Sequence, residues 1–236
     1  MIYMGSKARI AKELLPIILF GREEGQYYIE PFCGGCNSLC LVDGNRIGND
    51  KNEYLIEMWK ALTSGSSFPI TITRELYSEV RNSYNKRDNK YSKAEKGWIG
   101  FMGSFNGRFF DGGYSGHLVG NRNYISEQIK NTLKQIDKLK DVIWQSGEYY
   151  NIIIPDNSII YCDPPYKNTK QYSTSRNFDY DRFYKWCIDM KSKGHKVFIS
   201  EYKMPEPFAC IWQREVINSL NQKITKRPIE KLFTIY

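Results

Sequence analysis

The run Asp163-Pro164-Pro165-Tyr166 carries the most specific chemical pattern in the chain. It directly follows residues 158–162, a near-continuous apolar run that is typical of a buried parallel strand. The prolines fix φ and lack N–H donors, so the turn is stiff and its carbonyls remain available as acceptors. The Asp163 carboxylate and the Pro164 carbonyl can therefore accept both hydrogens of an exocyclic amino group, and Tyr166 can stack on the ring that bears it.

A glycine-containing turn and a later acid form a second pattern. The turn follows a short predicted strand, 26–30, and its glycines let the backbone bend sharply and approach a ligand closely. It lacks the spacing G-x-G-x-x-G, which argues against an ordinary dinucleotide site. Asp50 ends the next predicted strand, where its carboxylate can accept hydrogen bonds from both hydroxyls of a ribose. The turn consists of Glu30, Pro31, Phe32, Cys33, Gly34 and Gly35.

An open α/β sheet must position these residues. The order strand, glycine turn, strand ending in an acid, and helix is typical of its beginning, and ligands bind at the carboxyl ends of its strands. Ser6 is a candidate N-cap for a helix with apolar positions from Ile10 to Ile18. A second helix is predicted around 55–62 and a third around 183–190, ended by Gly194. The strands are predicted near 26–30, 46–49, 142–144, 158–162 and 196–200, with an antiparallel pair near 211–212 and 232–235.

Residues 67–140 interrupt this pattern and are predicted to form an inserted, mainly helical domain, which leaves 1–66 and 141–236 as the α/β domain. The insert contains a glycine-rich aromatic loop, 104–114, which is either a small local core or a surface that reads a partner. On the second interpretation, the contact residues are Phe105, Arg108 and Tyr114.

Composition bounds the class of protein. The 236 residues carry a net charge of +8 and 15% aromatic residues, which together favour a polyanionic partner with stackable bases. Without a long apolar run or an apolar leader, we expect a cytoplasmic protein, with a monomer as a plausible state. Cys33 and Cys36 have C-x-x-C spacing, which we interpret as small apolar packing, with a redox pair as the alternative; no metal is expected.

These motifs, in this order and over nearly the whole chain, resemble the D12-class (Dam-type) DNA adenine N6-methyltransferases of bacteria and their phages. The resemblance implies a Rossmann-like sheet that binds S-adenosylmethionine (SAM), an inserted target-recognition domain, and a role in DNA methylation for restriction-modification or a phage. It implies that Tyr3 and Lys7 contact SAM, with Lys7 near its methionine end. It also implies that the glycine turn and Asp50 bind SAM and that Asp163 to Tyr166 form the catalytic motif. Cys36 departs from the family, because many members have glycine there.

The resemblance implies transfer of a methyl group to N6 of an adenine that is flipped out of the DNA duplex. The segment after the catalytic motif is predicted to close over the extruded base, with a plain surface loop as the alternative; its candidate DNA contacts are Lys170, Tyr172 and Arg176. An RNA adenine methyltransferase and a catalytically inactive DNA-binding relative remain as alternatives. Asp163 argues against a protein glutamine methyltransferase, which has Asn there, and against most cytosine N4 enzymes, which have Ser.

Overall fold

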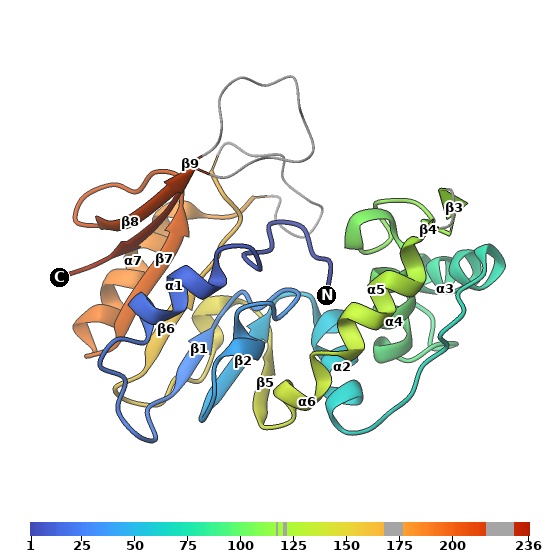
Figure 1. The fold of residues 1–236 in the computed structure, drawn as a ribbon, viewed down its shortest axis with the longest axis horizontal. Helices are drawn as coiled ribbons and strands as arrows, with labels where there is room; N and C mark the ends of the chain where they lie inside the picture. The colour runs from blue at the N-terminus through green and yellow to red at the C-terminus, as the bar shows by residue number, and fades with distance from the viewer. Residues whose placement is uncertain (117, 120–121, 168–176, 216–228) are drawn as a thin grey trace.

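A single mixed sheet organises the molecule (Figure 1). The computed structural model describes residues 1–116, 118–119, 122–167, 177–215 and 229–236. The strand order is β5-β2-β1-β6-β7-β9-β8; neighbours from β5 to β7 are parallel, and β9 is antiparallel to both β7 and β8. The strands are β1 Tyr28–Glu30, β2 Arg46–Asp50, β5 Val142–Ser146, β6 Ile159–Cys162, β7 Lys196–Glu201, β8 Ala209–Glu215 and β9 Ile229–Thr234.

Helices cover both faces of the sheet, and alternating side chains divide its core into two clusters. Along β6, Ile159 and Tyr161 join the cluster that includes α1 Ala11–Ile18 and α2 Glu53–Thr63. Ile160 and Cys162 point into the other cluster, against α7 Tyr180–Ser192. Because β6 is buried on both faces, its sequence is continuously apolar up to Asp163.

The predicted insert is mainly helical and packs beside the sheet (Figure 1). Ser92 and Glu95 form a capping box that starts α4, and an added Cβ at Gly97 would collide with the Tyr54 carbonyl oxygen. This close approach of α4 to α2 gives the insert and the sheet one shared hydrophobic cluster. A separate domain at 67–140 therefore stays a prediction. The elements of the insert are α3 Arg74–Lys86, α4 Lys93–Gly103, the hairpin β3 Leu118–Val119 and β4 Arg122–Asn123, α5 Tyr124–Leu133 and α6 Ile136–Leu139.

The α/β fold is confirmed, including the late antiparallel pair, but the predicted start of the first helix is wrong. The helix begins at Ala11, and Ile10 occupies the N-cap position without a side-chain cap. Ser6 Oγ accepts from Ala8 N at 3.2 Å and from the Asn37 side chain at 2.8 Å, ahead of the helix, because residues 1–7 run across the strand ends (Figure 1). Among the described residues, no helix is long and apolar enough to cross a membrane.

Candidate active site

The catalytic motif lies directly after β6, and Lys7 reaches it from the N-terminal segment. A turn with Gly5 at φ +78° brings Lys7 over the strand ends. Lys7 Nζ lies 3.1 Å from Asp163 Oδ1 and 3.6 Å from Glu230 Oε2. Its ammonium also donates to the Gly5 carbonyl at 3.1 Å. Two carboxylates and a carbonyl thus surround one buried ammonium group.

Tyr166 is fixed in the same cluster. Its hydroxyl donates to Glu230 Oε2 at 2.7 Å, and Lys7 Nζ lies 4.4 Å from its ring centroid. The Tyr202 ring contacts it edge-on, with the ring centroids 4.7 Å apart. The ring is only 8% exposed and is held on three sides, so stacking of a base on Tyr166 stays a prediction.

Burial and charge set the protonation of this cluster. Burial raises the pKa of Asp163 to about 6, although the Lys7 ammonium opposes that rise. Burial disfavours the charge on Lys7, but the carboxylates of Asp163 and Glu230 outweigh it, so the pKa of Lys7 is raised. At neutral pH, Lys7 is therefore a cation and Asp163 is mainly a carboxylate that can accept hydrogen bonds.

The glycine turn is shaped around Tyr3. A Cβ added at Gly34 would lie 2.6 Å from Tyr3 Cε1, and one at Gly35 would lie 2.7 Å from Tyr3 Cβ. Glycines are therefore required here for the approach of the Tyr3 side chain. Cys36 has a φ of +53°, which is a left-handed conformation that glycine adopts more readily.

Asp50 ends β2 beside this turn. One carboxylate oxygen accepts from Gly34 N at 3.1 Å and the other from Asn52 N at 2.9 Å. Each oxygen retains a lone pair, so both can still accept from a diol. Burial raises the pKa of Asp50 to about 6. The carboxylate is thus oriented by the backbone and available to a ribose.

Three of the predicted SAM contacts make interactions within the protein that support the turn. Glu30 is buried and accepts from the Tyr28 hydroxyl at 2.8 Å, and burial raises its pKa to about 8. The Phe32 ring packs against Tyr149, with centroids 5.4 Å apart, and against Phe183 at 5.8 Å. Pro31 contributes its carbonyl to the Asn49 side chain at 2.9 Å. Direct contact of these three with SAM stays a prediction.

Three residues of this cluster are not among those predicted from the sequence: Glu201, Tyr202 and Glu230. Glu201 accepts from Lys167 N at 3.0 Å and from Tyr202 N at 2.7 Å, and burial raises its pKa to about 6. An acid directly after an apolar strand could have identified Glu201, because the same signal identified Asp163. Glu230 has no such signal, since β9 enters the sheet in the opposite direction.

The predicted DNA contacts in the insert have different surroundings. Phe105 is 53% exposed, and Arg108 is partly buried. The Tyr114 hydroxyl donates to the Ile72 carbonyl at 2.7 Å, and the Arg74 guanidinium lies over its ring. Contact of all three with DNA stays a prediction. The remaining predicted contacts, Lys170, Tyr172 and Arg176, lie outside the described residues.

The two cysteines of the turn are buried thiols whose side chains are hydrogen-bonded to each other. Burial raises the pKa of Cys33 well above its ordinary value and also raises that of Cys36. A raised pKa disfavours the thiolate that disulfide exchange requires, which favours apolar packing over a redox pair. Within the described part of the chain, no group of His, Cys, Asp and Glu is arranged to hold a metal ion.

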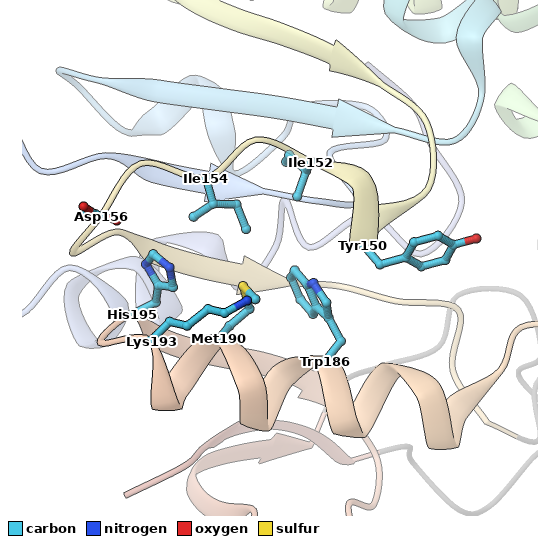
Figure 2. Close-up of a pocket in the computed structure, with 8 residues that line it drawn as sticks. All are labelled: Tyr150, Ile152, Ile154, Asp156, Trp186, Met190, Lys193 and His195. Carbon is cyan, nitrogen blue, oxygen red and sulfur yellow. The ribbon is translucent and has the colours of Figure 1, made fainter.

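A hollow of about 410 Å³ lies away from this cluster, between α7 and the segment before β6 (Figure 2). His195 lies directly before β7, toward the amino ends of the strands. Its Nδ1 accepts from Ser158 N at 3.1 Å, so this ring supports the local backbone. The hollow contains none of the predicted site residues. Its lining consists of Tyr150, Ile152, Ile154, Asp156, Trp186, Met190, Lys193 and His195.

Comparison with known proteins identifies the family. Residues 3–226 match the model of the D12 class N6 adenine-specific DNA methyltransferases. The chain belongs to this family. Among solved structures, the D12-class chain is matched to SMU.472, which is named as a methyltransferase complexed with SAH, at 14% identity and a TM-score of 0.39. The match covers 98% of this chain and 54% of the other, so this chain spans about half of that protein's length.

Proposed function

We propose that this D12-class protein transfers a methyl group from SAM to N6 of adenine in DNA. The observation that carries the proposal is the placement of Asp163 and Tyr166 at the end of β6, beside a buried Lys7 and next to the glycine turn. Family membership supplies the reaction class, and the geometry supplies acceptors for an amino group.

The residues at the strand ends fit SAM. Asp50 can accept from the ribose hydroxyls. The backbone of the glycine turn, which packs against Tyr3, lies beside Asp50. The carboxylates of Asp163, Glu201 and Glu230 outnumber the Lys7 cation, which favours a sulfonium at this edge. When bound, SAM supplies an electrophilic methyl group.

For the target base, Asp163 and the Pro164 carbonyl accept the two N6 hydrogens and direct the nitrogen lone pair toward the methyl donor. Tyr166 provides a stacking surface for the extruded adenine. Positive charge develops on N6 during transfer, and the adjacent carboxylate stabilises it. The Asp163 carboxylate is suitably placed to take up the proton that N6 then loses.

A transfer assay tests this function. Purified protein is incubated with methyl-labelled SAM and a random-sequence DNA pool, and N6-methyladenine is mapped by sequencing. We expect label in DNA at a defined sequence context. Label only in RNA of matched sequence would favour the RNA alternative, and SAM and DNA binding without transfer would favour an inactive relative.

The cellular setting is part of the proposal. We infer a cytoplasmic protein that acts on DNA in a bacterial or phage-infected cell, where methylation serves a restriction-modification system or a phage. The net charge of +8 supports association with DNA.

A further inference from the structure

Glu230 lies inside the catalytic cluster although it comes from the end of the chain. It is on β9, beyond the segment 3–226 that matches the family. Its side chain is only 13% exposed. Its Oε2 accepts from the Tyr166 hydroxyl at 2.7 Å and lies 3.6 Å from Lys7 Nζ. It therefore contacts both groups that flank Asp163.

We propose that Glu230 is a positioning residue for methyl transfer: it fixes the Tyr166 ring and shares the Lys7 cation with Asp163. The inference rests on the proposed function, because it assigns a task within the same site. Glu230 is suited to this task because its backbone belongs to an inner strand. In the register of β7 and β9, Glu201 pairs with Lys231, which holds Glu230 at the same edge as Glu201.

Sharing Lys7 keeps Asp163 a strong acceptor. If Asp163 alone balanced Lys7, the pair would be neutral, and the ammonium would draw on the same carboxylate that must bind N6. With Glu230 present, one cation lies between two carboxylates and the three groups carry a net charge of −1. That negative charge favours both the sulfonium and the positive charge that develops on N6.

Glu230 also acts on the protonation of Asp163. Its negative charge raises the pKa of Asp163, whereas Lys7 lowers it. Removal of the Glu230 charge should therefore lower the pKa of Asp163. A loss of local order would lower this pKa as well, because it would relieve the burial that raises it, so the variant must also keep the wild-type NMR spectrum for the other aspartates. The charged and titratable groups around Asp163 are Lys7, Glu30, Tyr161, Tyr166, Glu201, Tyr202 and Glu230.

The decisive variant is Glu230→Gln, which keeps an oxygen that can accept from Tyr166 but removes the charge. Glu215→Gln is the matched control, because Glu215 is an exposed acid at the end of the adjacent strand β8. The titration of Asp163 is followed by NMR of ¹³C-carboxyl-labelled aspartate, with the resonance assigned from Asp163→Asn. This measurement requires no turnover.

We expect Glu230→Gln to lower the titration midpoint of Asp163 by roughly half to one pH unit, as loss of a nearby charge in a partly shielded site would do. Glu215→Gln should leave it unchanged. In single-turnover transfer to DNA, the acid limb of the rate profile should move to lower pH by the same amount. At pH 8 the rate should fall roughly tenfold, with KM for SAM within about twofold.

The outcomes separate this role from the proposed function. A wild-type chain that methylates neither DNA nor RNA overturns the function, and this role with it. An active wild type, combined with a Glu230→Gln variant whose midpoint and rate are both unchanged, overturns the role of Glu230 alone. A midpoint that rises in Glu230→Gln also overturns it, because the sign contradicts a shared cation. A lowered midpoint with an unchanged rate overturns the positioning role, because the charge would then act on Asp163 without affecting transfer.

Discussion

Two regions of the molecule differ in what they bury. The proposed catalytic edge of the sheet (Lys7, Asp163 and Glu230) buries charges, whereas the aromatic centre of the insert (around Phe109 and Phe110) buries rings. At the edge, the charged side chains of Lys7, Asp163 and Glu230 are largely shielded from solvent, with exposures of 8%, 23% and 13%. In the insert, Phe109 and Phe110 pack with Tyr54, Tyr84 and Phe101, with adjacent ring centroids about 5 Å apart. Burial of charge lowers stability and burial of rings raises it, so the two regions should respond differently to substitution.

This difference separates the two interpretations of the loop 104–114. Most of its aromatic side chains belong to a local core: Phe110 is 3% exposed, and Tyr114 packs on Tyr77 with its hydroxyl bonded to Ile72. Phe105 is the aromatic residue of this loop that is more than half exposed. The loop is thus mainly a small core that presents one ring to solvent.

The largest expected effect is at the catalytic edge. Asp163→Ala removes the carboxylate that orients N6, so transfer of labelled methyl groups to DNA should fall by roughly 10³-fold or more, about 4 kcal/mol in the barrier. Binding of DNA, measured by fluorescence anisotropy, should change little. Near-normal turnover in this variant would contradict the assignment of the active site.

In the aromatic centre, the expected effect is on stability. Phe110→Ala should lower the free energy of unfolding in urea by about 3–5 kcal/mol, because it leaves a cavity in a packed core. Phe105→Ala, which alters an exposed ring of the same loop, should change it by less than about 0.5 kcal/mol. Equal losses of stability in the two variants would contradict the division of this loop into a buried core and one exposed ring.

The pH dependence of the methyl-transfer rate should reflect the ionisation of groups at the catalytic edge and not a change in the aromatic centre. Asp163 must be ionised to accept from N6, and burial raises its pKa to about 6. The single-turnover rate should therefore be low below pH 5, rise through about pH 6 and level off near pH 8, while the fold persists by circular dichroism. A rate that falls as pH rises through 6 would have the wrong sign for a carboxylate acceptor.

A smaller effect is expected for DNA contact. Phe105→Ala should weaken DNA binding by about threefold to tenfold, the effect of losing one stacking or apolar contact. Titration with fluorescent DNA measures the affinity. The control is Phe20→Ala, which removes a ring that is 84% exposed and lies outside the insert. Equal affinity of wild type and Phe105→Ala would remove this residue from the interface.

The smallest effect concerns the aromatic group beside the glycine turn. Among the described residues, the buried Tyr149 hydroxyl has no hydrogen-bond partner. Tyr149→Phe should therefore leave stability unchanged or raise it by about 1 kcal/mol, since it removes an unsatisfied polar group. A loss above 1 kcal/mol in urea unfolding would indicate a partner for this hydroxyl.

The sequence predicts those site residues that lie at the carboxyl end of a parallel strand. Asp50 ends β2 and Asp163 directly follows β6, so their placement at the same edge of the sheet could be predicted from strand direction. Glu230 could not, because its position depends on a reversed strand inserted between β7 and β8. The predicted N-cap at Ser6 was wrong for a related reason: Lys7 and Tyr3 bind across the strand ends and delay the helix.

The position of β9 has a consequence for synthesis. As the chain leaves the ribosome, β8 emerges before the strand that must separate it from β7. Until β9 emerges, β7 exposes an open edge and Tyr166 lacks its carboxylate partner. A stop codon at position 227 would spare every motif in the matched segment 3–226, yet yield a chain with an incomplete sheet and an incomplete site. The cluster of Lys7, Asp163, Tyr166 and Glu230 is therefore incomplete until residues 229–236 have joined the sheet.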